Sequence, residues 1–246
     1  MRDGIRAVAF DLDGTLYPNS SLYWRLIPFV IKELRFMTAF SKARNIFHAS
    51  PGQGKELAGI IAGANGDFYA DQAAVTANLL GAEPEYIQQK LEKCVYRGWE
   101  PHFKKVRLFK YAVQAIQAFR AAGLKLGLLS DFPPETKIKN LGIETDVQTG
   151  TAYWDSVLCT EVIGALKPDP LSFFKLADTL QTAPSQILYV GNSYHYDVVG
   201  AKNAGMMAAL IDRSLHLPCC FLSKKYNPRP DFIFHDYRQL IDFVLS

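Results

Sequence analysis

The sequence predicts an α/β fold, in which a Rossmann-like parallel sheet has helices on both faces and an α-helical cap domain is inserted after the first strand. Three observations support this prediction. An apolar run near the N-terminus ends in two aspartates. The next stretch, residues 18–105, has helical periodicity and almost no strand pattern. From residue 106 onward, helical segments alternate with short apolar runs, which is typical of a parallel sheet.

The composition is that of an ordinary globular protein. The chain has 246 residues, of which 49% are hydrophobic and 21% charged, enough for one large domain or two modest ones. Its net charge of +3 is too small to indicate nucleic-acid binding without a basic stripe or an aromatic platform, and we find neither. Nothing near the N-terminus resembles a signal peptide, so we expect a cytoplasmic protein.

The first strand is predicted at the segment VAFDLDGT, residues 8–15, where the apolar run gives way to Asp11 and Asp13. Two residues apart on an extended backbone, these carboxylates lie on the same side of the chain. Gly14 follows, and glycine permits a tight turn. We therefore expect both carboxylates to face one site at the end of the strand.

Residues 18–105 are predicted to form the cap. Residues 22–40 are strongly apolar, but charged side chains interrupt the run, so we expect a helix packed on protein and no membrane span. Because proline is tolerated in a first helical turn, this helix is expected to begin near Ile27, just before Pro28. Further helices are predicted at residues 71–81 and 83–99.

Residues 1–17 and 106–246 are predicted to form the split α/β core. Each helical segment of the second part is paired with a short apolar run, and the last run is followed by a final helix. Helices are expected at residues 108–123, 170–180, 197–205 and the end of the chain, and strands at 124–131, 187–192, 207–212 and near 231.

Polar residues follow several predicted strands. In an open parallel sheet, ligands bind beyond the carboxyl ends of the strands, so these residues are candidates for a functional site. They are Asp11, Asp13 and Thr15 after the first strand, Ser130 and Asp131 after the second, Lys167 in the segment GALKPDP, and Asn192 and Asp197 in the segment GNSYHYD.

These segments, in this order, resemble the four motifs of the haloacid dehalogenase-like (HAD) hydrolase superfamily, specifically its phosphatase branch with an inserted helical cap. DLDGT matches the first motif, Ser130 the second, LKPDP the third and GNSYHYD the fourth, and the match covers the whole chain. The resemblance implies a phosphoric monoester hydrolase that acts on a small phosphorylated metabolite, with Mg²⁺ as cofactor.

The resemblance also implies a role for each residue. Asp11 is the nucleophile that forms an aspartyl-phosphate, and Asp13 is the general acid and base. Lys167 is the cation that offsets the charge of the transferring phosphoryl group. The implied phosphate-binding residues are Ser130, Asp131, Thr15 and Lys167.

Mg²⁺ prefers oxygen ligands, and the resemblance implies a site at Asp11, Asp13, Asn192 and Asp197. Two positions depart from the family pattern. Asn192 stands where the fourth motif usually has an aspartate, and Asp131 stands where asparagine is common. An amide still offers an oxygen but carries no charge, so either a weakened or an abolished metal site follows from this sequence.

Other functions remain open. A haloacid dehalogenase would also use Asp11 as nucleophile, but the presence of Asp13 argues against it. A phosphonate hydrolase would need a Schiff-base lysine from the cap, and the sequence does not place Lys32, Lys42 or Lys55 there. A catalytically weak protein that binds phosphate or a partner is a third alternative, which the substituted fourth motif favours.

Overall fold

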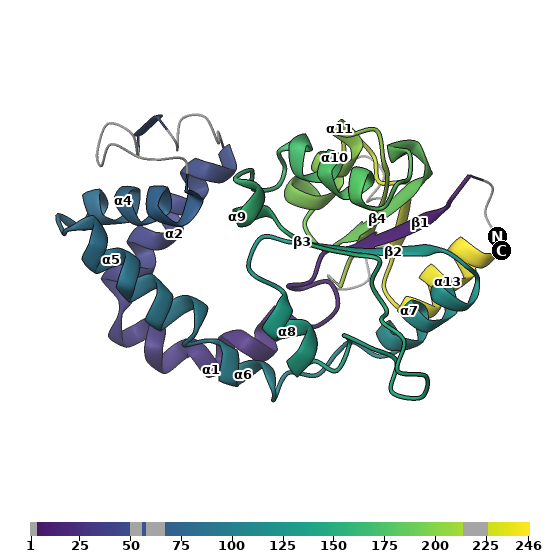
Figure 1. The fold of residues 1–246 in the computed structure, drawn as a ribbon, viewed down its shortest axis with the longest axis horizontal. Coiled ribbons are helices and arrows are strands. Elements are labelled where there is room, and N and C mark those ends of the chain that lie inside the picture. The colour runs from purple at the N-terminus through teal and green to yellow at the C-terminus, as the bar shows by residue number, and fades with distance from the viewer. Residues whose placement is uncertain (1–3, 50–55, 58–66, 214–225) are drawn as a thin grey trace.

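The structure, a computed structural model, describes residues 4–49, 56–57, 67–213 and 226–246, and among these a parallel sheet is the centre of the fold (Figure 1). Six strands follow the order β3-β2-β1-β4-β5-β6, and each neighbouring pair is parallel. The strands are β1 (Ala7–Phe10), β2 (Lys125–Ser130), β3 (Ser156–Cys159), β4 (Ile187–Gly191), β5 (Met207–Ile211) and β6 (Phe232–Phe234). This arrangement confirms the predicted α/β fold class.

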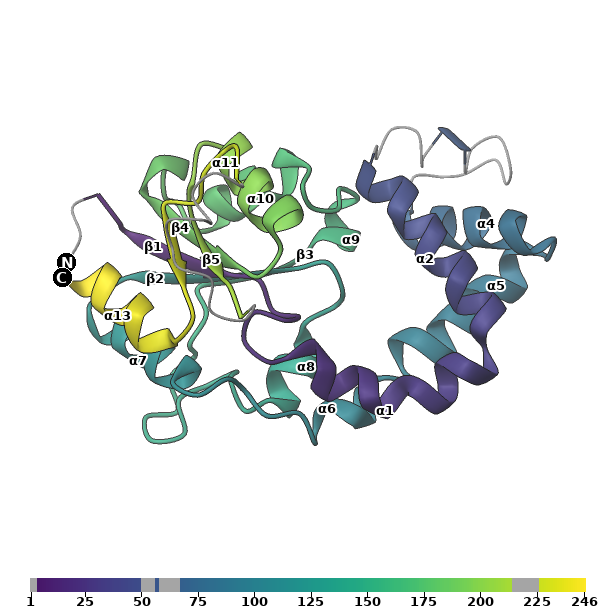
Figure 2. The ribbon, with the colours of Figure 1, turned by 180° about the vertical axis from the view of Figure 1, so that it is seen from behind.

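Helices cover both faces of the sheet, as the front and back views show (Figure 1, Figure 2). Successive side chains of β1 point to opposite faces. Val8 and Phe10 pack with α7 and α13, whereas Ala7 and Ala9 pack with α10 and α11. Because both faces are covered, β1 is buried along its whole length, which explains its unbroken apolar run. The covering helices are α7 (Ala112–Ala121), α10 (Pro170–Thr179), α11 (Gly200–Asn203) and α13 (Tyr237–Leu245).

The helices between β1 and α7 have an apolar core of their own, in which Phe36, Phe40 and Leu91 pack together. They form a separate group of helices to one side of the sheet in both views (Figure 1, Figure 2). None of the described helices is long and apolar enough to cross a bilayer. The boundaries of the cap, 18 and 105, stay a prediction. The helices are α1 (Asn19–Lys32), α2 (Leu34–Ala49), α4 (Phe68–Leu80), α5 (Pro84–Leu91), the π-helical η1 (Glu92–Tyr96) and α6 (Glu100–Phe103).

The first of these helices begins earlier than predicted. We expected a start near Ile27, but α1 starts at Asn19 and contains Pro28 in its interior. Proline lacks the N–H that would bond the carbonyl four residues earlier, that of Trp24. Both Pro28 and Trp24 lie at exposed positions, so water can satisfy this carbonyl. The prediction was wrong because solvent compensates for the missing hydrogen bond.

Short helices shape the loops near the sheet. They are α8 (Glu135–Asn140), which follows β2, α9 (Thr160–Ile163), which follows β3, the 3₁₀ turn η2 (Pro184–Gln186) before β4, and the π-helical η3 (Tyr194–Val199) after β4.

Candidate active site

The predicted site residues gather at the carboxyl edge of the sheet, where β1 and β4 lie side by side. The strand order reverses direction at this pair, and ligands of open α/β sheets bind at such a reversal. Asp11 directly follows β1, and its backbone N–H donates to the carbonyl of Val190 in β4, at 2.9 Å. One cavity of about 470 Å³ is lined by Asp11, Asp13, Asp131, Lys167, Asn192 and Asp197, together with residues of α1 and α2.

Lys167 is the centre of this group. Its Nζ donates to Asp11 Oδ1 at 2.7 Å and to Asp197 Oδ1 at 2.8 Å. The lysine is 2% exposed, and both carboxylates are buried as well. One ammonium therefore serves two carboxylates, and the cluster as a whole carries excess negative charge.

Burial and the neighbouring charges together set the pKa values of these groups. Burial raises the pKa of Asp11 to about 7; Lys167 opposes that shift, while Asp197 and Asp13 add to it. Burial also works against the ammonium form of Lys167, but Asp11 and Asp197 together hold its pKa well above the usual value. The pKa values of Asp11 and Lys167 are therefore both raised. The ammonium has two carboxylates to stabilise its charge, whereas the two carboxylates share a single ammonium.

Thr15 joins the first and fourth motifs. Its Oγ1 lies 2.8 Å from Asp11 Oδ2 and 3.1 Å from Asn192 Oδ1. A hydroxyl has one proton to donate, so Thr15 serves one of the two oxygens at a time, and both oxygens keep lone pairs for another partner. Gly14 makes the close approach possible, because it has a φ of 91° and a Cβ there would come within 2.7 Å of Asn192 Nδ2. Tyr237 of α13 holds the same turn, since its hydroxyl donates to the Thr15 carbonyl at 2.6 Å.

The Asp11 carboxylate and the Asn192 amide offer oxygens that suit a hard cation. Among the described residues, no group of three or more histidine, cysteine or acidic side chains is arranged to hold a metal ion. The oxygens that converge on Thr15 come instead from one carboxylate, Asp11, and one amide, Asn192. Mg²⁺ is usually held by one or two carboxylates with water and other oxygens, and this pair satisfies that requirement.

Asp13 faces the same cavity and has two partners that the sequence did not reveal. Lys137, in α8, places its Nζ 2.5 Å from Asp13 Oδ2, and Tyr17 donates its hydroxyl to Asp13 Oδ1. The Lys137 ammonium also lies over the rings of Phe103 and Phe132, at 5.3 and 5.1 Å. No motif marks Lys137, because a lysine in a short polar helix is ordinary surface sequence.

Ser130 and Asp131 differ in accessibility, since Asp131 is half-buried and lines the cavity. Ser130 is fully buried, and its Oγ accepts a hydrogen bond from the backbone N–H of Phe132 at 3.3 Å. Asp131 Oδ1 accepts from Thr160 Oγ1 at 2.7 Å and from the backbone N–H of Lys167 at 3.3 Å. Burial opposes the ionisation of Asp131, but the positive groups around it bring its pKa below the usual value. Asp131 thus braces the loop that carries Lys167.

Helix α2 contributes two further residues that sequence reasoning missed. The Arg44 guanidinium is buried, forms an ion pair with Glu161 of α9, and donates to Gln72 Oε1 at 3.0 Å. His48 Nδ1 donates to the Lys167 carbonyl at 2.6 Å, and burial lowers the pKa of its imidazole. The contacts with Glu161 and with the Lys167 carbonyl join a cap helix to the core.

Comparisons with known proteins identify the family of this chain. The model of the haloacid dehalogenase-like hydrolases matches residues 5–205, so the chain belongs to that family of hydrolases. The chain is 26% identical, over 98% of its length and 97% of the relative's, to a protein named glyceraldehyde 3-phosphate phosphatase from Methanopyrus kandleri.

Two solved structures share the fold. One is a HAD phosphatase from Thermococcus onnurineus, with a TM-score of 0.60, 22% identity and 98% of both chains covered. The other is an L-2-haloacid dehalogenase from Xanthobacter autotrophicus, with a TM-score of 0.61, 19% identity and coverage of 98% of this chain and 99% of that one. Since the two differ in their named reactions, the fold alone does not choose between them.

Proposed function

We propose that this protein is a magnesium-dependent phosphatase that hydrolyses a small phosphate monoester through an aspartyl-phosphate at Asp11. The observation that carries the proposal is the Lys167 ammonium held between Asp11 and Asp197, with Asp13 facing the same cavity. The named function of the Methanopyrus kandleri relative supports it. Asp13 favours this reaction over dehalogenation, because an ester needs a proton for its leaving oxygen.

In the first step, a carboxylate oxygen of Asp11 attacks phosphorus, and the bond between phosphorus and the leaving oxygen breaks. Asp13 gives its proton to that oxygen, and the alcohol departs. In the second step, Asp13 takes a proton from water as the water oxygen bonds to phosphorus. The bond to Asp11 then breaks and inorganic phosphate leaves, so both aspartates return to their starting forms.

Charge stabilisation would come from several groups. Lys167 stays bonded to Asp11 and keeps its charge throughout, since its pKa is well above the usual value. The charge of the transferring phosphoryl group spreads over its outer oxygens, where a fixed cation stabilises it most. Thr15, Ser130 and Asp131 are proposed to complete the phosphate pocket, the last two chiefly by fixing the loops around it.

Mg²⁺ would be held by the Asp11 carboxylate and the Asn192 amide oxygen, with Asp13 and Asp197 as the further proposed members of the site. When bound, it supplies positive charge that offsets the repulsion between Asp11 and a phosphate dianion. Residues 18–105 are proposed to act as a cap that excludes water from the reacting phosphate. A small phosphate ester is the proposed substrate.

The test is hydrolysis of p-nitrophenyl phosphate with and without Mg²⁺, by the natural protein and by Asp11→Asn. We expect magnesium-dependent turnover in the first and at least about a thousandfold less in the second, because an amide is not a nucleophile of this kind. Asp178→Asn is the matched control, since Asp178 is exposed on α10 away from the site. Unchanged turnover in folded Asp11→Asn, or release of halide from 2-haloacids in place of phosphate, would overturn the proposal.

A further inference from the structure

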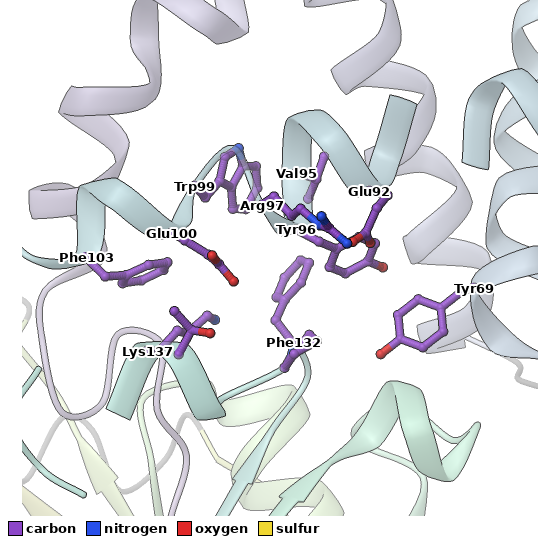
Figure 3. A pocket seen from close by; sticks show the side chains of 12 residues that line it. Tyr69, Glu92, Val95, Tyr96, Arg97, Trp99, Glu100, Phe103, Phe132 and Lys137 are labelled. Atoms are coloured by element: carbon purple, nitrogen blue, oxygen red, sulfur yellow. The ribbon is translucent and has the colours of Figure 1, made fainter. Parts of the chain in front are cut away.

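A second cavity, of about 240 Å³, opens between the cap helices and the core beside the candidate active site (Figure 3). Five of its lining residues are aromatic: Tyr69, Tyr96, Trp99, Phe103 and Phe132. They come from α4, η1, α6, the loop before α6 and the loop after β2. No role proposed so far uses this cavity.

The cavity communicates with the site through shared walls. Trp99 and Phe132 line both this cavity and the one that contains Asp11. Lys137 also lines it, and the Nζ of Lys137 bonds to Asp13. In the proposed reaction Asp13 must reach the leaving oxygen, so a group attached to that oxygen starts at the mouth of the aromatic cavity.

The aromatic rings are steeply inclined to one another. The Tyr96 ring lies 5.4 Å from that of Tyr69, at 78°, and 6.4 Å from that of Phe132, at 58°. The Trp99 and Phe132 rings are 5.9 Å apart, at 51°. A planar ring in this space can stack on one wall while its edge meets another, the two arrangements that aromatic pairs prefer.

Cations of the protein already occupy one aromatic wall of the cavity, which argues against a cationic occupant. Two basic residues, Arg97 and Lys137, and two acidic residues, Glu92 and Glu100, line the cavity, and Arg97 is paired with Glu92. The Phe132 ring, however, already faces the Arg44 guanidinium at 4.0 Å and the Lys137 ammonium at 5.1 Å. Aromatic cages bind ammonium ligands through ring faces, and here the Phe132 ring already has cations of the protein as partners. The Lys137 ammonium instead suits an oxygen on which negative charge develops.

Size limits the occupant further. A cavity of about 150 Å³ holds a benzene ring, so about 240 Å³ holds one ring with a small substituent. We propose that the leaving group of the natural substrate carries a single planar aromatic or heteroaromatic ring, which enters this cavity while Lys137 faces the ester oxygen. This inference rests on the proposed function and names its substrate class.

The test compares benzyl phosphate with cyclohexylmethyl phosphate. Both are esters of primary alcohols and are nearly equal in size, so they differ mainly in the planarity of the ring. We expect kcat/KM to be about threefold to tenfold higher for benzyl phosphate. Equal values for the two esters, or a preference for phosphocholine over benzyl phosphate, would overturn the inference.

A variant locates the effect. Thr136, on α8, is exposed and lines the cavity, so Thr136→Trp should fill it without disturbing the core. We expect kcat/KM for benzyl phosphate to fall about tenfold and that for methyl phosphate to stay within about twofold. Lys139→Trp, at an exposed position of α8 outside the cavity, is the control and should change neither value. If Thr136→Trp leaves benzyl phosphate unaffected, the ring binds elsewhere and the inference is wrong.

The experiment also separates this inference from the proposed function. If no phosphate ester is hydrolysed, the proposed function fails. The cavity is then judged by calorimetric binding of benzylphosphonate against cyclohexylmethylphosphonate, neither of which requires turnover. Tighter binding of the aromatic compound that Thr136→Trp abolishes would support a ring-binding cavity, and equal affinities would overturn it.

Discussion

Two buried ion-pair clusters each include a residue that contacts Asp131, and the clusters differ in charge balance. In the cluster of Lys167, one ammonium bonds to two carboxylates, Asp11 and Asp197. In the cluster of Arg44, one guanidinium bonds to a single carboxylate, Glu161. The first cluster lies at the carboxyl edge of the sheet, whereas the second joins α2 of the cap to α9.

The difference separates chemistry from scaffolding. Buried charges are costly, and pairing one cation with one anion limits that cost, which suits a structural connection such as Arg44 with Glu161. An unbalanced cluster stays short of positive charge. That deficit around Asp11 suits a site that receives a cation and a reacting phosphoryl group. Burial raises the pKa of Asp11, and the neighbouring carboxylates Asp197 and Asp13 add to that shift.

Removing the cation from the unbalanced cluster should have the largest effect. Lys167→Met leaves Asp11 and Asp197 buried without their ammonium, so we expect the free energy of unfolding to fall by about 3–5 kcal/mol. We also expect phosphatase turnover to fall at least about a thousandfold, because the fixed charge on the phosphoryl group is lost. Urea denaturation and steady-state kinetics measure the two effects. Normal turnover in this variant would break the comparison.

The same change in the balanced cluster should affect stability but not chemistry. Arg44→Met leaves Glu161 buried without its partner, and we expect a loss of about 3–5 kcal/mol in the free energy of unfolding. Turnover of p-nitrophenyl phosphate at saturating substrate should stay within about tenfold, since Arg44 touches no proposed reacting atom. The double variant Arg44→Met with Glu161→Gln should recover most of the stability. A loss of turnover as large as that of Lys167→Met would show that the second cluster is catalytic.

Adding charge to the unbalanced cluster sharpens the comparison. Asn192→Asp places a carboxylate where the amide oxygen meets Thr15, so we expect the magnesium concentration for half-maximal activity to fall about tenfold. Without magnesium, the same variant should melt at a lower temperature, because negative charge is added to a cluster already in excess. Magnesium titrations followed by activity and by thermal melting check this. No response to magnesium in either protein would contradict the metal site.

The smallest effect concerns pH and the Arg44→Met variant. Burial raises the pKa of Glu161, and Arg44 opposes that shift. Without the guanidinium, the native state keeps a proton on Glu161 that the unfolded state releases above its ordinary pKa. The native state then binds more protons, so stability falls as the pH rises. We expect the melting temperature of Arg44→Met, relative to the natural protein, to drop more at pH 8 than at pH 5. A constant difference would mean that Glu161 stays ionised.

The contrast between the two clusters also marks how far the sequence could predict the molecule. Asp11, Lys167 and Asp197 were predictable because each follows a strand and belongs to an ordered set of motifs. Arg44 and Glu161 were not, since a pair 117 residues apart depends on how the cap meets the core. No local sequence pattern predicts the contact between the cap and the core. In the sequence, a lysine such as Lys137 looks like any exposed helical residue.

The fold was predicted more fully than the site, with exceptions that have physical causes. Helical periodicity and apolar runs located most elements, but β3 is only four residues long, at the edge of the sheet, and two of its residues are half-buried. Such a strand carries little apolar signal. The early start of α1 was missed because the proline rule assumes that a freed carbonyl is shielded from water, and that of α1 lies on an exposed face.

The position of β1 in the sheet affects how the nascent chain folds during translation. This strand is synthesised before β2 and β4, yet it lies between them in the sheet. Its neighbour β4 begins only at Ile187, so a nascent chain shorter than this exposes an unpaired apolar edge of β1. Translation must pass Gly191 before that edge is covered. We therefore expect chains truncated before β4 to aggregate and to depend on chaperones that hold nascent chains.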